Sequence, residues 1–207
     1  MTRQTPRVVI FDLGKVLVDF DYAIAARRIA ARGNLSTTEV QSIVEASPLL
    51  FRFETGQINS AEFYKEVCRL TGYRGTQQEF EPEFSDIFSA IEPMIGAHET
   101  LRRLGLPTFI LSNTNELAVT HIRGQFPFFS NFEGYILSFE QQSMKPSERI
   151  YEIAEAITGA RGADILYIDD RLENLQPAKR LGWNVVHHQD VELTLGIFRE
   201  LGLLPTG

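Results

Sequence analysis

The chain has 207 residues, of which 43% are hydrophobic and 23% are charged, and its net charge is −7. This composition is typical of a globular protein, and the length suits one α/β domain with an insertion or two small domains. Because the net charge is negative and both signs are interspersed, we expect no nucleic-acid partner and no membrane-surface role. Cys68 is the single cysteine, which excludes an intrachain disulfide and a thiolate metal cluster.

The first predicted strand is residues 8–11, an unbroken apolar run that ends at Asp12, with Gly14 two residues later. Such a run is typical of a strand buried on both faces, as in a parallel sheet under helices. Asp12 then falls at the carboxyl end of the strand, where open α/β sheets place their ligands. Taken alone, the segment is also typical of an ordinary Asp-x-Gly turn. The apolar run is too short for a signal peptide, and we expect a cytoplasmic protein with no membrane span.

Residues 19–91 are predicted to be helical, with no strand between about residues 19 and 94. Apolar residues recur at helical spacing in four segments. Ser36 and Glu39 form a capping-box pattern at the start of the second segment. The stripe of the fourth segment consists of Phe80, Phe84, Ile87 and Phe88. So long a helical stretch directly after the first strand predicts an inserted helical cap.

Strands and helices alternate after the cap. Strands are predicted at residues 107–113, 134–139, 164–170 and 183–187, and helices at residues 97–104, 146–157 and 172–181. This alternation predicts an α/β fold with a doubly wound parallel sheet. The core would comprise residues 1–18 and 92–207, and the cap residues 19–91. The amphipathic tail, residues 193–204, is expected to pack on the sheet. A contact between two copies is the alternative, so monomer and homodimer both stay open.

Polar residues gather where the predicted strands end. These residues are Asp12, Ser112 with Asn113, residues 143–145, and Asp169 with Asp170. In a parallel sheet these ends share one edge, so distant residues can converge. A carboxylate can attack a phosphoryl group, but its charge opposes the approach to an anion, so a divalent cation must bridge them. Each element alone also has an ordinary structural explanation, such as a strand exit, a solvated lysine or a helix cap. Their joint occurrence predicts a site for phosphoryl chemistry.

With these motifs in place, the chain resembles the haloacid-dehalogenase superfamily. The motifs similar to those of the superfamily are Asp12-Leu-Gly-Lys-Val16, Leu111-Ser112-Asn113, Lys145-Pro146, and Ile168-Asp169-Asp170 with Asn174. The Asp-Leu-Gly branch, which includes bacterial glucose-1-phosphate phosphatases, looks most similar, also at residues 111–115 and 53–58. The resemblance covers nearly the whole chain, and as a set the motifs are highly specific. It implies a Rossmann-like core with a helical cap after the first motif.

The resemblance implies a magnesium site. Asp12 would be the nucleophile and a magnesium ligand, Gly14 would offer its backbone carbonyl to the metal, and Asp170 would be the third protein ligand. Asp169 and Asn174 would orient this acidic loop.

The resemblance also implies a phosphate site. Ser112 and Lys145 would bind the phosphoryl group, with Asn113 close by, and Lys145 would take part in catalysis. Selectivity should reside in the cap, where the polar candidates are Arg52, Glu54 and Gln57.

One position departs from the commonest pattern of the superfamily. Many relatives have a second Asp two residues after the nucleophile, which serves as general acid and base. Here that position is Gly14, which has no side chain to donate a proton. Lys15 follows, and we expect it to be solvated or salt-bridged, with a catalytic role as the alternative.

The favoured function is a magnesium-dependent phosphatase that hydrolyses a small phosphorylated metabolite, with a sugar phosphate preferred, through an aspartyl-phosphate intermediate. A metal-independent hydrolase of the haloacid-dehalogenase type is the alternative enzyme. Asp169 and Asp170 would repel each other without a cation, which favours the phosphatase. A sensor that binds a phosphorylated ligand without turnover is the third hypothesis, because the acid at position 14 is missing.

Overall fold

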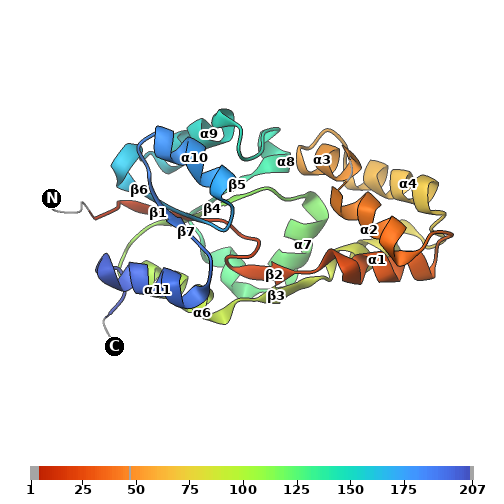
Figure 1. The fold of residues 1–207 in the computed structure, drawn as a ribbon, viewed down its shortest axis with the longest axis horizontal. Helices are drawn as coiled ribbons and strands as arrows, with labels where there is room; N and C mark the ends of the chain where they lie inside the picture. The colour runs from red at the N-terminus through yellow and green to blue at the C-terminus, as the bar shows by residue number, and fades with distance from the viewer. Residues whose placement is uncertain (1–4, 47, 206–207) are drawn as a thin grey trace.

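The computed structural model describes residues 5–46 and 48–205 (Figure 1). Five strands form one parallel sheet in the order β5 (Gly134–Leu137), β4 (Thr108–Ser112), β1 (Val8–Phe11), β6 (Ile165–Asp169) and β7 (Asn184–His187). The predicted doubly wound α/β fold is confirmed. Residues 1–4, which belong to the segment tested for a signal peptide, lie outside the described residues.

The central strand β1 is buried on both faces because its alternate residues point in opposite directions. Val8 and Ile10 belong to one apolar cluster, and Val9 and Phe11 belong to another. The first face is covered by α9 (Glu148–Thr158) and α10 (Leu172–Arg180), and the second by α6 (Glu92–Arg103), α7 (Glu116–Gln125) and α11 (Val191–Glu200). Figure 1 shows α9 and α10 on one side of the sheet and α6 and α11 on the other.

The C-terminal tail packs on the sheet, as expected, because Phe198 of α11 is fully buried in the second cluster. Among the described residues, no helix combines the length and the apolar character that a membrane crossing requires.

Five further helices lie beyond one end of the sheet (Figure 1). They are α1 (Tyr22–Ala31), α2 (Thr37–Ala46), α3 (Pro48–Glu54), α4 (Ser60–Thr71) and α5 (Gln77–Ser85). They share an apolar cluster distinct from the two that cover the sheet, and this cluster also includes Leu117 of α7. Leu117 therefore joins the packing of these helices to that of α7. The predicted capping box at α2 forms, since the Glu39 amide donates to Ser36 Oγ (3.4 Å) and the Ser36 amide donates to Glu39 Oε2 (2.9 Å).

The prediction that no strand occurs between about residues 19 and 94 is wrong. β2 (Val18–Phe20) pairs antiparallel with β3 (Phe88–Ala90), and α5 ends at Ser85, so the fourth helical stripe stops before Ile87 and Phe88. A strand of three residues is too short to show a period of two, and its partner lies far away in the sequence. We propose that this two-stranded ribbon marks the boundary between core and cap.

Several boundaries after the cap also differ from the prediction. α6 begins at Glu92 rather than at residue 97, and α11 ends at Glu200, before the predicted end of the tail at residue 204. α9 begins at Glu148 rather than at Pro146, which lies in the turn before the helix. β5 ends at Leu137, and the residues that continue its apolar run form α8 (Ser138–Gln141). The residue types at the start of α9 and at the end of β5 suit a turn as well as a helix or a strand, so the sequence alone does not fix these two boundaries.

Candidate functional site

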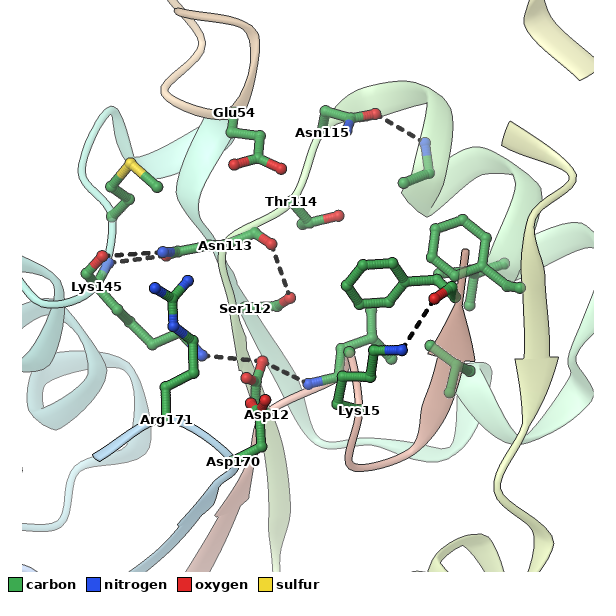
Figure 2. Close-up of a pocket in the computed structure, with 18 of the residues that line it drawn as sticks. Asp12, Lys15, Glu54, Ser112, Asn113, Thr114, Asn115, Lys145, Asp170 and Arg171 are labelled. Carbon is green, nitrogen blue, oxygen red and sulfur yellow. Dashed lines mark hydrogen bonds and ion pairs between the residues drawn. The ribbon is translucent and has the colours of Figure 1, made fainter. Parts of the chain in front are cut away.

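The carboxyl ends of two neighbouring strands, β1 and β6, bring the predicted acidic residues together. Asp12 follows β1, Asp169 ends β6, and Asp170 comes next. One carboxylate oxygen from each of these three residues lies within 4.8 Å of the others. Figure 2 shows Asp12 and Asp170 side by side, with Ser112 above them at the end of β4. The convergence expected from parallel strands is therefore present.

Lys145 places a buried ammonium group among these acids. Its Nζ lies 2.9 Å from Asp12 Oδ1 and 2.7 Å from Asp169 Oδ2, and it donates to the Leu111 carbonyl oxygen at 3.0 Å. Burial opposes the charge on Lys145, but the adjacent carboxylates of Asp12 and Asp169 outweigh it and raise its pKa. The side chain is therefore a fixed positive charge beside Asp12.

Asp169 is held by hydrogen bonds to both of its carboxylate oxygens. Oδ1 accepts from the Arg171 amide (2.8 Å) and from Asn174 Nδ2 (3.0 Å), and Oδ2 accepts from Lys145 and the Tyr167 hydroxyl. Burial opposes ionisation of Asp169, but Lys145 and these hydrogen bonds lower its pKa. Since each oxygen already has two donors, Asp169 acts as an anchor with no free position for another ligand.

Asn113 fixes the backbone that carries Lys145. Its Oδ1 accepts from the Lys145 amide at 2.8 Å, and its Nδ2 donates to the Lys145 carbonyl oxygen at 2.9 Å. The side-chain amide of Asn113 is thus occupied in positioning the lysine. The Ser112 hydroxyl lines the cavity and donates only a long bond, 3.4 Å, to the Asn113 carbonyl oxygen. It is therefore the freer of the two to meet a ligand.

Asp12 and Asp170 are the two acids of the site that ionise less readily than an ordinary carboxyl group. Burial raises the pKa of Asp12 to about 8, Asp169 and Asp170 push it in the same direction, and Lys145 opposes them. Burial and then the charge of Asp169 raise the pKa of Asp170. Oδ1 of Asp12 also accepts from the Leu13 amide at 2.7 Å, whereas Oδ2 has no donor among the described residues. One oxygen of Asp12 is thus free to face a ligand.

The Phe20 ring occupies the space that a side chain on Gly14 would enter. A Cβ on Gly14 would lie 2.8 Å from Phe20 Cε1, well inside van der Waals contact. Lys15, with φ of 60°, lies over the same ring at 4.7 Å from its centroid and donates to the Phe20 carbonyl oxygen at 3.0 Å. Its Nζ also pairs with Asp19. The predicted salt-bridged state of Lys15 is confirmed.

These residues line a cavity of about 360 Å³ between the sheet edge and the cap. Asp12, Gly14, Ser112, Asn113, Lys145, Asp170 and Asn174 all lie in its wall. Of the three cap candidates, Glu54 lines the cavity, and Figure 2 shows its carboxylate pointing into it. Arg52 and Gln57 are exposed and do not appear in that wall.

Sequence reasoning missed Tyr167, Arg171 and Phe20. Tyr167 reads as one more apolar residue of a buried strand, yet it stands two residues before Asp169 and so shares its face of β6. That spacing was the available signal. Arg171 directly follows the acid pair and lines the cavity. Phe20 gave no signal, because the position of its ring depends on the β2–β3 ribbon.

The model of the haloacid dehalogenase-like hydrolase family matches residues 6–182. A sesquiterpene phosphatase of Aspergillus oryzae is 23% identical over 200 residues, covering 95% of this chain and 97% of the relative. An (S)-2-haloacid dehalogenase of Pseudomonas fluorescens is 27% identical over 133 residues, covering 62% of this chain and 56% of the relative.

Solved structures show the same fold. A HAD family enzyme of Bacteroides thetaiotaomicron superposes with a TM-score of 0.80 at 21% identity, covering 93% of this chain and 99% of that one. A second structure of that enzyme, in complex with magnesium and inorganic phosphate, gives a TM-score of 0.78 at 21% identity, covering 89% and 96%. A family model that spans most of the chain, including the strand ends that form the cavity, decides the assignment. The chain belongs to the haloacid dehalogenase-like hydrolases.

Proposed function

We propose that this hydrolase is a magnesium-dependent phosphatase that cleaves a small phosphorylated metabolite, preferably a sugar phosphate, through an aspartyl-phosphate. The observation that carries the proposal is the charge of the cavity floor, which consists of Asp12, Asp169, Asp170 and Lys145. Asp12, Asp169 and Asp170 converge on one ammonium group, that of Lys145, which cannot balance three carboxylates, and the raised pKa values of the buried Asp12 and of Asp170 show that their ionised forms need a further positive charge. A divalent cation has the charge that this floor lacks, and carboxylate oxygens are the ligands that magnesium prefers.

The donor set fits magnesium at Asp12 and Asp170, with the Gly14 carbonyl as the third protein ligand. Asp169 would stay outside the metal shell, since donors already occupy both of its oxygens. Asn174 would hold Asp169 in that role, at 3.0 Å. When bound, the cation would supply the positive charge that lets a carboxylate approach an anionic phosphate ester.

The protein's own residues would perform the covalent chemistry. The free oxygen of Asp12 would attack phosphorus, and the bond from phosphorus to the ester oxygen would break. Lys145 would offset charge on the phosphoryl oxygens, and Ser112 would donate a hydrogen bond to one of them. Asn113 would keep Lys145 in place through its backbone. Water would then hydrolyse the acyl phosphate and regenerate Asp12.

The size of the cavity and the relatives support a small phosphate ester. About 360 Å³ lies in the range that encloses a small molecule. The HAD family enzyme of Bacteroides thetaiotaomicron has been crystallised with magnesium and inorganic phosphate, and the relative from Aspergillus oryzae is a sesquiterpene phosphatase. The dehalogenase relatives favour the alternative hydrolase, but its metal-free chemistry would leave Asp170, beside the ionised Asp169, with no cation in direct contact among the described residues.

The test is a panel of phosphorylated metabolites, assayed for phosphate release with magnesium and with chelator, on the wild type and on Asp12→Asn. The amide keeps the shape of Asp12 but loses the nucleophile and a metal charge. We expect magnesium-dependent turnover that falls by roughly 10⁴-fold or more in the variant, the scale of nucleophile removal in other hydrolases. Residual activity within about tenfold of wild type would refute the role of Asp12. Turnover of a haloacid in chelator would establish the dehalogenase, and binding without turnover would establish the sensor.

A further inference from the structure

Glu54 is the one predicted cap residue whose side chain reaches the cavity wall, and α3 holds it there rigidly. The preceding residue, Phe53, is fully buried and stacks on Phe63 with ring centroids 4.4 Å apart. The Thr55 hydroxyl donates to the Phe51 carbonyl oxygen at 2.8 Å and closes the end of the helix. Glu54 therefore lies at a fixed helix terminus and not on a free loop.

A close backbone contact seats this helix end on the core. Gly56 follows α3 with a φ of +66°, and a Cβ there would lie 2.1 Å from the Phe139 carbonyl oxygen of α8. Glycine alone tolerates both the left-handed conformation and so close an approach. The contact fixes the height of α3 above the sheet edge, and with it the place of Glu54 opposite Asp12 and Asp170 in the cavity (Figure 2).

The carboxyl group of Glu54 is unpaired in the described part of the chain. No hydrogen bond or ion pair reaches it, although the Arg171 guanidinium is near enough to lower its pKa. Burial is the larger influence and raises the pKa to about 7. The other titratable or charged groups that line the same cavity are Tyr22 of α1, Glu45 of α2, Lys15, Asp12, Lys145, Asp170 and Arg171. Glu54 is thus a carboxyl group that is partly protonated near neutral pH.

The first motif has no proton donor at Gly14. The Phe20 ring occupies the space that a side chain there would enter, and Lys15 beside it is engaged by Asp19 and by the Phe20 carbonyl oxygen. A donor has to come from another wall of the cavity. Glu45 is exposed on the rim, whereas Glu54 points inward.

We infer that Glu54, carried by the cap, is the catalytic general acid and base of this hydrolase, an assignment that rests on the proposed phosphatase function. As Asp12 bonds to phosphorus, the ester oxygen leaves with the electron pair of its bond and takes the proton of Glu54. A water molecule then gives a proton to the Glu54 carboxylate and attacks the phosphorus of the aspartyl-phosphate. Phosphate and free Asp12 result, and Glu54 is protonated again.

The test compares kcat/KM across phosphate esters whose leaving groups differ in basicity, from 4-nitrophenyl phosphate through phenyl phosphate to an alkyl phosphate. The proteins are the wild type, Glu54→Gln, Glu54→Asp and Glu45→Gln, all with magnesium. Glu54→Gln should lose about 100- to 1,000-fold on the alkyl ester and less than about fivefold on the nitrophenyl ester, because a poor leaving group depends most on the acid. The plot against leaving-group pKa should therefore be steeper in this variant. Glu54→Asp should lie between the two, and Glu45→Gln should keep the wild-type slope.

The pH profile gives an independent readout. With the alkyl ester, wild-type kcat/KM should fall as the pH rises above about 7, because Glu54 loses the proton that it must donate. This decline should be absent in Glu54→Gln. Equal losses across the series, or equal losses in Glu45→Gln, would overturn the inference and leave the phosphatase standing. An enzyme that fails on the nitrophenyl ester even as wild type would overturn the proposed function, and this inference with it.

Discussion

Replacing Lys145 with methionine should destabilise the metal-free protein strongly. Its ammonium group lies 2.9 Å from Asp12 Oδ1 and 2.7 Å from Asp169 Oδ2, and both acids are buried. Methionine keeps most of the apolar stem, so the main loss is the charge. Removing one partner of a buried ion pair leaves the other charge uncompensated, which costs about 3–5 kcal/mol. For a chain of this size, that corresponds to a fall in Tm of roughly 6–20 °C.

The assay is urea unfolding in chelator at pH 7.5, with wild type, Lys145→Met, Asp169→Asn and the double variant. The double variant has one fewer buried carboxylate without a counter-charge than Lys145→Met has. Its free energy of unfolding should therefore exceed the value expected from adding the two single effects by about 1 kcal/mol or more. Loss of Lys145 raises the folded-state pKa of the acids, so the fold binds more protons than the unfolded chain. The deficit of Lys145→Met should therefore shrink as the pH falls from 7.5 toward 5. A loss below about 1 kcal/mol would refute the assignment of Lys145 as the buried counter-charge.

Two further changes test other parts of the molecule. Asp170→Ala should raise the magnesium concentration needed for half-maximal activity, and excess magnesium should recover part of the turnover; an unchanged magnesium requirement, measured by titration, would place Asp170 outside the metal site. His98 is fully buried, stacks on Phe132 with ring centroids 3.9 Å apart, and has no hydrogen-bond partner for either ring nitrogen among the described residues. Burial lowers its pKa to about 4 from the ordinary 6.5, so stability that is present above pH 6.5 is lost as the pH falls toward 4. Relative to wild type, His98→Leu should gain about 2 kcal/mol between pH 7.5 and pH 5 in urea unfolding; equal pH dependence in the two proteins would show that His98 is not the group responsible.

The sheet and the residues at its edge could be predicted because few physical rules determine them. An unbroken apolar run needs burial on both faces, and parallel strands present their carboxyl ends at one edge. Those two rules place Asp12, Asp169 and Asp170 at one edge of the sheet before any coordinate is known, whereas the structure shows that β1 and β6 are neighbours. The ribbon formed by β2 and β3 could not be found in this way, since three residues such as Phe88–Ala90 carry no readable period.

Which of the cap residues reaches the cavity could be determined only from the structure. The sequence offered Arg52, Glu54 and Gln57 as equal candidates, because the direction of each side chain depends on how α3 sits on the core. The position of α3 on the core is set by the contact of Gly56 with Phe139, and these two residues lie far apart in the chain. Nothing in the local pattern of either segment reports on such a contact. The position of Phe20 over Gly14 depends in the same way on a long-range pairing.

The location of the proposed donor follows from the charge of the floor. Three carboxylates already crowd one ammonium group there, and burial together with Asp169 raises the pKa of Asp170. A further carboxyl group next to Gly14 would join that crowd, so its pKa would depend on the occupancy of the metal site. The pKa of Glu54 is set instead by burial and by Arg171, with no contribution from the floor acids. Placing the acid on the cap therefore separates the titration of the proton donor from the charge that binds metal and phosphate.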